Sequence, residues 1–135
     1  MTIEWNERWD TVDTQINHQH QQLFVLINQV IHSADAAQTS ACVQHLLHYF
    51  DAHFAYEELQ MRQSRYPLID DHVADHAQFR SKMHHLQQNQ SNLSPVLYKF
   101  QLVAVFKEWM QQHILQHDAK LAEFLSYGET RQASL

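Results

Sequence analysis

Histidine is the residue type that stands out in this chain, because it fills 12 of the 135 positions. Neutral imidazole is a common ligand of transition metals, and carboxylates often complete such sites. Two pairs of these residue types, His53 with Glu57 and His72 with His76, are spaced four residues apart. That spacing places both members of a pair on the same face of an α-helix. The pairs therefore indicate metal binding as the chemistry that the chain could perform.

Three further residues of these types, His20, His113 and Asp118, interrupt other helical stripes of apolar residues. Apolar stripes face the core of a helical protein, so we expect all the interrupting side chains to point inward. Counting along the expected helices at about 1.5 Å per residue places them within about two helical turns of one level. The predicted metal ligands are His20, His53, Glu57, His72, His76, His113 and Asp118.

Any one of these histidines, taken alone, could instead be a packed and hydrogen-bonded core residue, since buried polar groups usually find a partner. The set of seven argues against that alternative, because leaving so many groups unpaired would cost roughly 1–3 kcal/mol each. Glu58 lies one step off the face of Glu57, so we expect it to face solvent or to support a ligand. Surface positions are expected for His18, His32, His45, His48, His84, His85 and His117.

Long helices are expected to carry these residues, because one glycine and two prolines are too few for the many turns of a β-rich fold. Apolar spacing and capping residues predict an N-terminal arm over residues 1–16, followed by four helices. Asn17 is the expected N-cap of the first helix, and Gly128 the residue just past the end of the last. The helices are predicted over residues 18–36, 40–64, 71–88 and 95–127.

Short connections make neighbouring helices antiparallel, so the expected fold is all-α, an up-down-up-down four-helix bundle with an N-terminal arm. We expect residues 1–135 to form one domain. Residues at helical spacing predict the core, and Ala34 and Phe100 are among those expected to face it. Trp5, Trp9 and Val12 of the arm are expected to pack across the bundle.

Composition argues against several kinds of partner. The formal net charge of −6 and the lack of a Lys/Arg cluster argue against nucleic acid. No apolar run approaches the roughly 20 residues that span a bilayer, so no membrane association is expected. Residues 1–10 are polar, so no signal peptide is expected. The single cysteine, Cys42, cannot form an internal disulfide, which favours a reducing, cytoplasmic location.

The ordered set of motifs resembles the hemerythrin family, specifically its single-domain bacterial form. The resemblance covers nearly the whole chain. Each motif is short, but their order and spacing together are specific. They are the runs 16–20 and 53–58, Met61, the pair Tyr66-Pro67, the pair His72 and His76, the run 109–114, and Asp118.

The resemblance implies a non-haem di-iron centre, with iron as Fe2+ or Fe3+ and a bridging hydroxide or oxo group. It also implies one open coordination position, on the iron with fewer histidines, which dioxygen would occupy. The expected function is therefore reversible dioxygen binding, for oxygen storage, delivery or sensing. By the family pattern one iron would take His72, His76 and His113, the other His20 and His53, and the bridges would be Glu57 and Asp118.

Two other functions stay open at this point. The chain could be a di-iron redox enzyme that handles peroxide or nitric oxide, or an iron donor. It could also be a metal-stabilised module that signals oxygen to a protein partner, which the sequence leaves unknown. The sequence shows no evident general acid or base beyond the ligands, which favours an oxygen carrier over an enzyme. The absence of an output domain argues against signalling.

Two departures from the family pattern and one geometric difficulty are visible. Asn17 stands where an aspartate is often found, and Leu121 where a tyrosine commonly follows the last carboxylate; either could alter hydrogen bonding around the site. His113 and Asp118 lie five residues apart, which is about 140° on an ideal α-helix. Joint metal binding by these two residues therefore predicts a wide site or a local distortion, for which a π-bulge is one candidate.

Overall fold

The computed structural model describes the backbone of residues 2–133 and the side chains of residues 2–128. Within that part of the chain every regular element is helical, so the all-α prediction is confirmed. None of the described helices combines the length and apolar character needed to cross a membrane. The main helices are α1 (Thr14–Ile31), α2 (Ala36–Ser64), α3 (Ile69–Gln88), α4 (Pro95–His113) and α5 (Ala119–Ala133), with short 3-10 turns at Glu7–Trp9 and Gln90–Asn92.

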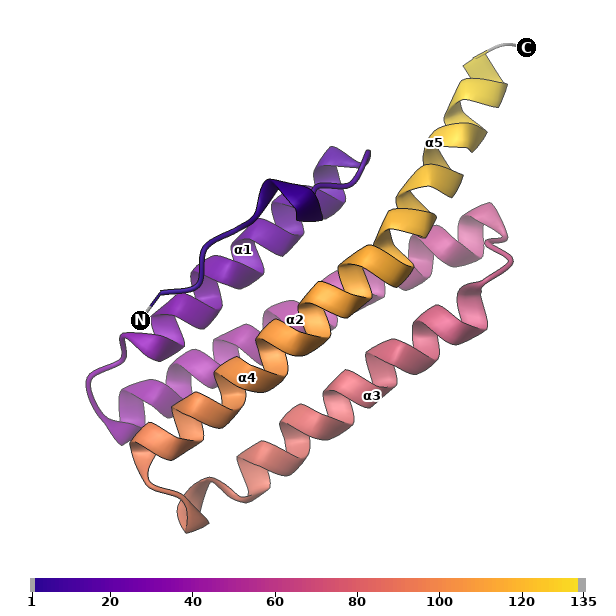
Figure 1. Cartoon of the computed structure of the whole chain (residues 1–135). Helices are drawn as coiled ribbons and strands as arrows, with labels where there is room; N and C mark the ends of the chain where they lie inside the picture. Colours follow the sequence, from indigo (N-terminus) through magenta and orange to yellow (C-terminus); the bar gives the residue numbers. More distant parts are fainter. Residues whose placement is uncertain (1, 134–135) are drawn as a thin grey trace.

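The first four helices form a bundle in which consecutive helices run in opposite directions (Figure 1). α1 packs against α2 and α4, and α3 packs against the same two helices. A π-helical stretch over Ile114–Asp118, called the π segment below, joins α4 to α5. These three pieces make one continuous helix, whose last turns extend past the other helices (Figure 1). The predicted antiparallel four-helix bundle is therefore confirmed.

α1 begins four residues earlier than predicted because a different residue caps it. The Asp13 side chain accepts a hydrogen bond from the backbone N–H of Ile16 at 2.9 Å, which is the usual N-cap contact. Asn17, the predicted cap, instead accepts a hydrogen bond from the backbone N–H of Thr11 at 2.7 Å and so ties the arm to the helix. Aspartate and asparagine are about equally good N-caps, so the sequence alone did not separate them.

α2 also begins earlier than residue 40. Asp35 caps it by accepting a hydrogen bond from the backbone N–H of Gln38 at 2.8 Å. Ala34, expected on the inner face of the first helix, therefore lies exposed in the connection between the two helices. α2 ends at Ser64 as predicted, and Arg65 follows in the left-handed conformation with φ 55°.

The last helix differs from its prediction at three points. It is interrupted by the π segment, and α5 continues to residue 133 instead of ending before Gly128. Gly128 lies inside α5 and does not have a positive φ, so it is not a left-handed cap. Phe100 was expected to face the core, yet it is 63% exposed. The start is as predicted, since Ser94 accepts a hydrogen bond from the backbone N–H of Leu97.

The apolar core has two parts, and the polar residues of interest fall between them. On α2 the apolar residues at helical spacing are all buried, as predicted, with Phe50 in the larger cluster and Met61 in the smaller one; they are Val43, Leu46, Phe50, Phe54 and Met61. On α1, Leu23 belongs to the larger cluster and Ile16 to the smaller. Each helix thus changes from apolar to polar and back to apolar along its inner face. The predicted ligands occupy the polar level between the two clusters.

The N-terminal arm lies along α1 (Figure 1). Trp5 and Trp9 both pack on Phe24, with ring centroids 5.2 Å apart in each case. The side chain of Asn28 accepts one hydrogen bond from the arm backbone and donates another to it, both at 2.8 Å. Packing of the two tryptophans is therefore as predicted. Val12 is 64% exposed, so its expected packing is wrong.

Candidate metal centre

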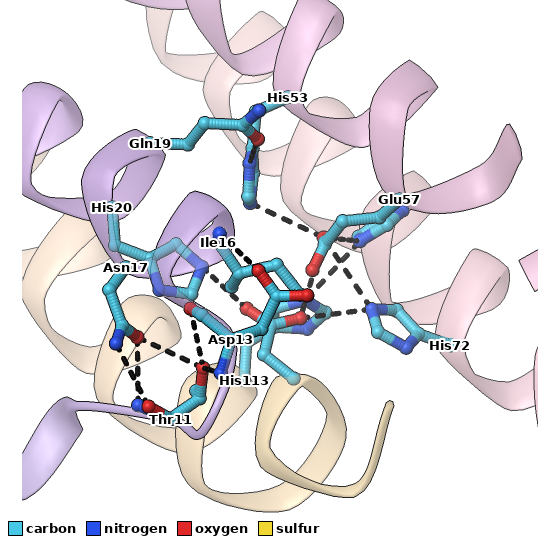
Figure 2. A network of polar contacts seen from close by, with 12 residues as sticks. Thr11, Asp13, Ile16, Asn17, Gln19, His20, His53, Glu57, His72 and His113 are labelled. Atoms are coloured by element: carbon cyan, nitrogen blue, oxygen red, sulfur yellow. Dashed lines mark hydrogen bonds and ion pairs between the residues drawn. The ribbon is translucent and has the colours of Figure 1, made fainter. Parts of the chain in front are cut away.

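All seven residues predicted as ligands come together in the middle of the bundle. They are drawn from every helix of the bundle and from the π segment, and each is at most 2% exposed. Figure 2 shows that the side chains labelled His20, His53, Glu57, His72 and His113 point toward one another. Such burial of five histidines and two carboxylates needs compensation, because charged and polar groups are costly to remove from water.

The candidate ligand atoms form two overlapping groups, within each of which all atoms lie within 4.8 Å of one another. One group contains three histidines and the other contains two, while both carboxylates belong to both groups. The two groups are Glu57, His72, His76, His113 and Asp118, called the three-histidine half below, and His20, His53, Glu57 and Asp118, called the two-histidine half.

Asp118 shows this sharing directly. Its Oδ2 lies 2.7 Å from Nε2 of His20, whereas its Oδ1 lies 2.9 Å from Nε2 of His113 and 3.0 Å from Nε2 of His72. The other carboxylate also borders both halves, since Oε1 of Glu57 lies 3.3 Å from Nε2 of His53 and 3.6 Å from Nε2 of His72. Both carboxylates thus border the histidines of both halves.

Many of these atoms have no hydrogen-bond partner, which tests whether the set suits a metal. Within the described residues, the buried side-chain atoms without such a partner are found in His20, Glu57, His72 and Asp118, and otherwise only in Tyr98 and Trp109. His76 Nε2 has hydrogen-bond geometry to Glu57 Oε1 at 3.1 Å, but these partnerless atoms approach other polar atoms of the cluster without it, as His20 Nε2 does at 2.7 Å from Asp118 Oδ2. Ligands around a shared cation have this arrangement, because their lone pairs point at the ion instead of at each other. The residues present therefore fit a metal centre.

The π segment is what brings Asp118 to the centre. The predicted local distortion is confirmed, because Ile114–Asp118 forms a π-helical turn directly after His113. A π turn takes in one residue more than an α turn, so residues five apart return to the same face. The result is the 2.9 Å approach between His113 Nε2 and Asp118 Oδ1.

A family comparison agrees with this geometry. The model of the Hemerythrin HHE cation binding domain matches residues 11–125, a range that includes all seven predicted ligands. The chain belongs to the hemerythrin family. No curated protein matched the chain. The buried cluster is accordingly the metal-binding site of a hemerythrin-type helical bundle.

Three histidines of this hemerythrin centre are held by partners outside it. Each uses Nδ1 toward an oxygen that can only accept, a carboxylate or an amide carbonyl, so Nδ1 carries the proton. The Nε2 lone pair is then left free to face the centre. The hydrogen-bonded pairs are His53 with Gln19 at 2.6 Å, His76 with Glu58 at 3.0 Å, and His113 with Asp75 at 2.6 Å.

Sequence reasoning missed Gln19 and Asp75, and left Glu58 between two roles, of which the structure shows the supporting one. The sequence did contain a signal. Each partner directly precedes or follows a ligand of its own helix, and it supports a histidine of the next helix. Gln19 precedes His20, Glu58 follows Glu57, and Asp75 precedes His76. A polar residue beside a ligand is rotated about 100° from the inner face, which directs it at the ligand of the next helix.

Aromatic rings close the hemerythrin centre from its sides. Phe54 stacks on His76 with ring centroids 3.9 Å apart, and Trp109 stacks on His113 at 4.2 Å. Trp5 of the arm lies against His20, with centroids 6.1 Å apart. These rings fix the orientation of the imidazoles and keep water away from them.

The other histidines follow their prediction with one exception. Six are exposed on the surface: His18, His32, His45, His48, His84 and His85. His117 is only 25% exposed, so its predicted surface position is wrong. It stacks on His113 with centroids 5.2 Å apart, and its Nε2 lies 3.8 Å from Asp75.

The two departures from the family pattern have different outcomes. The side-chain hydrogen bonds of Asn17 described in the structure join it to Thr11, so this residue ties the arm to α1. Leu121 is fully buried in the smaller apolar cluster together with Met61. An apolar side chain cannot donate a hydrogen bond, so Leu121 provides packing where a tyrosine would offer a hydroxyl.

The ionisation of the centre also suits cation binding. Burial lowers the pKa of His53 to about 4, so its imidazole is neutral at neutral pH. Burial and the neighbouring carboxylate both act to raise the pKa of Glu57, but His53 and other histidines outweigh them and lower it. Burial likewise acts to raise the pKa of Asp118, yet His113 and other histidines hold it well below its usual range. Both carboxylates are therefore ionised at neutral pH.

Proposed function

We propose that the protein binds dioxygen reversibly at a centre of two iron ions, for oxygen storage, delivery or sensing. The observation that supports this most is the sharing of both buried carboxylates between two groups of histidines, because it provides for two adjacent cations. Imidazole and carboxylate donors suit iron, although zinc or manganese can use the same groups. Bound iron would supply the electrons that make dioxygen binding favourable and reversible.

The seven side chains divide into three roles in this proposal. The three-histidine half holds one ion, the two-histidine half holds the other, and the carboxylates hold both. The second ion has fewer protein donors, so it is the one with room for a small external ligand. The roles are His72, His76 and His113 for the first ion, His20 and His53 for the second, and Glu57 and Asp118 as bridges.

The remaining residues prepare the site. Hydrogen bonds from Nδ1 to Gln19, Glu58 and Asp75 fix three imidazole rings and direct Nε2 inward. The stacked aromatic rings exclude water and proton donors, which would otherwise promote irreversible oxidation of the iron. A dry site with fixed ligands favours binding and release of a neutral gas over turnover of a substrate.

The deciding experiment is anaerobic reconstitution with Fe2+ followed by visible absorption as oxygen is admitted and removed. We expect two irons per chain and an absorption band that appears with oxygen and fades without it. Immediate and irreversible oxidation without such a band would favour the redox-enzyme alternative. Binding of fewer than two irons would contradict the two-ion centre itself.

Two variants connect this behaviour to named residues. His53→Ala removes a donor from the two-histidine half, and Glu57→Ala removes a bridge, so each should abolish the oxygen-dependent band. His45→Ala is a matched control, because His45 is an exposed histidine on the same helix. An unimpaired His53→Ala or Glu57→Ala protein would contradict the assignment.

A further inference from the structure

The two halves of the centre differ in the charge of the residues that hold their histidines. In the three-histidine half, His113 and His76 donate Nδ1–H to carboxylates, at 2.6 Å to Asp75 and 3.0 Å to Glu58. In the two-histidine half, His53 donates to the neutral amide of Gln19. Among the described residues, Nδ1 of His20 has no hydrogen-bond partner.

A carboxylate partner makes an imidazole a better ligand than an amide partner does. Its negative charge attracts the Nδ1 proton, which increases electron density at Nε2 and strengthens the bond to a cation. Removing such a partner typically lowers metal affinity by about 10–100-fold. The three-histidine half therefore has both more donors and better donors. His72, whose Nδ1 lacks a described partner, is its only histidine without this support.

The surroundings of the two carboxylates keep them in position. Nη2 of Arg80 lies 3.7 Å from Glu58 Oε2, and the Arg80 guanidinium also lies over the Phe54 ring, 4.9 Å from its centroid. Asp75 is 22% exposed and has Nε2 of His117 at 3.8 Å. Arg80 draws some charge from Glu58, so Asp75 is the stronger of the two supports.

We propose that the centre fills in a fixed order, with the three-histidine half taking the first ion tightly because of Asp75 and Glu58, and the two-histidine half taking the second ion weakly. This inference rests on the two-ion centre proposed above. It assigns Asp75, Glu58 and Gln19 as positioning residues that set the difference between the halves. Oxygen binding needs both ions, so the weaker half makes oxygen binding depend on the supply of free metal.

Stepwise titration of the full chain with Co2+ tests the order of filling, because the visible absorption of Co2+ and the heat of binding both report each ion. We expect two steps that differ in affinity by about 10–100-fold. His53→Ala should keep the first step and lose the second, whereas His76→Ala should weaken the first. The reverse pattern in these two variants would overturn the proposal.

Charge-removing variants test the cause. Asp75→Asn and Glu58→Gln keep an acceptor oxygen of the same shape but lose the charge. Each should lower the first affinity by about 10-fold or more, Asp75→Asn the more strongly, with the second affinity little changed. Gln19→Glu adds a charge to the other half and should raise the second affinity. Glu108→Gln is the control, because Glu108 is an exposed carboxylate on α4. A uniform effect of the variants on both steps would overturn the proposal.

The wild-type titration separates this proposal from the proposed function. Two ions bound with equal affinity would overturn ordered filling and leave the two-ion centre intact. Fewer than two ions bound would instead contradict the two-ion centre. Far-ultraviolet circular dichroism of each variant confirms that its helices are intact before its affinities are compared.

Discussion

Protons and metal compete for two histidines of the centre. Burial acts to lower the pKa of His113, but Asp118 and Asp75 outweigh it and raise the pKa well above its ordinary value. Burial also acts to lower the pKa of His72, and the nearby Asp118 and Glu57 raise it. A cation that binds Nε2 has to displace any proton there, so metal binding is coupled to proton release.

Metal affinity should therefore increase with pH across neutrality. A group with a raised pKa is protonated below that pKa, so fewer protons have to be displaced as the pH rises. We expect about one to two protons to be released when Zn2+ binds at pH 7, as measured by calorimetry in buffers of different ionisation heat. A binding heat that does not depend on the buffer would contradict this coupling.

At the scale of the elements, the π segment is the piece on which the geometry depends most. Inserting one alanine after Gln116, an exposed residue within it, should rotate Asp118 by about 100° away from the centre, because each added residue turns the chain by that angle. We expect this insertion to abolish binding of two Co2+ ions per chain. Inserting an alanine after Gly128 is the control, because that residue lies beyond the core and an added side-chain atom there would meet nothing within 4 Å. Full Co2+ binding after the insertion at Gln116 would show that the register set by the π segment is dispensable.

Much of this arrangement could be predicted from the sequence, because spacing along one helix is a local property. Residues such as Phe50 and His53 fall on one face at helical spacing, which predicts both burial and convergence. Helix starts were missed where two capping residues lay close together, as with Asp13 and Asn17. Partners such as Asp75 were missed because they act across a helix interface, and spacing does not give the rotation of one helix against the next.

At the scale of the whole molecule, the centre connects all the helices of the bundle. Metal removal should destabilise the fold, because the buried atoms of His20, Glu57, His72 and Asp118 that lack hydrogen-bond partners would then lack a metal as well. Metal at about 1,000 times its dissociation constant adds roughly 4 kcal/mol to the free energy of unfolding. That corresponds to a rise in Tm of about 10–15 °C, measured by thermal unfolding with Zn2+ and with a chelator. Equal Tm values under the two conditions would contradict a structural role for the metal.

The burial of the centre also has a kinetic consequence. Each ligand is at most 2% exposed, so an ion enters or leaves only when helices separate briefly. Such local openings take microseconds to seconds and depend on how firmly the elements pack. The residence time of the metal is then set by the aromatic packing of Phe50, Phe79 and Trp109 around the larger cluster, as much as by the bonds to the ligands. Two proteins with identical ligands and equal affinity can thus exchange metal at very different rates.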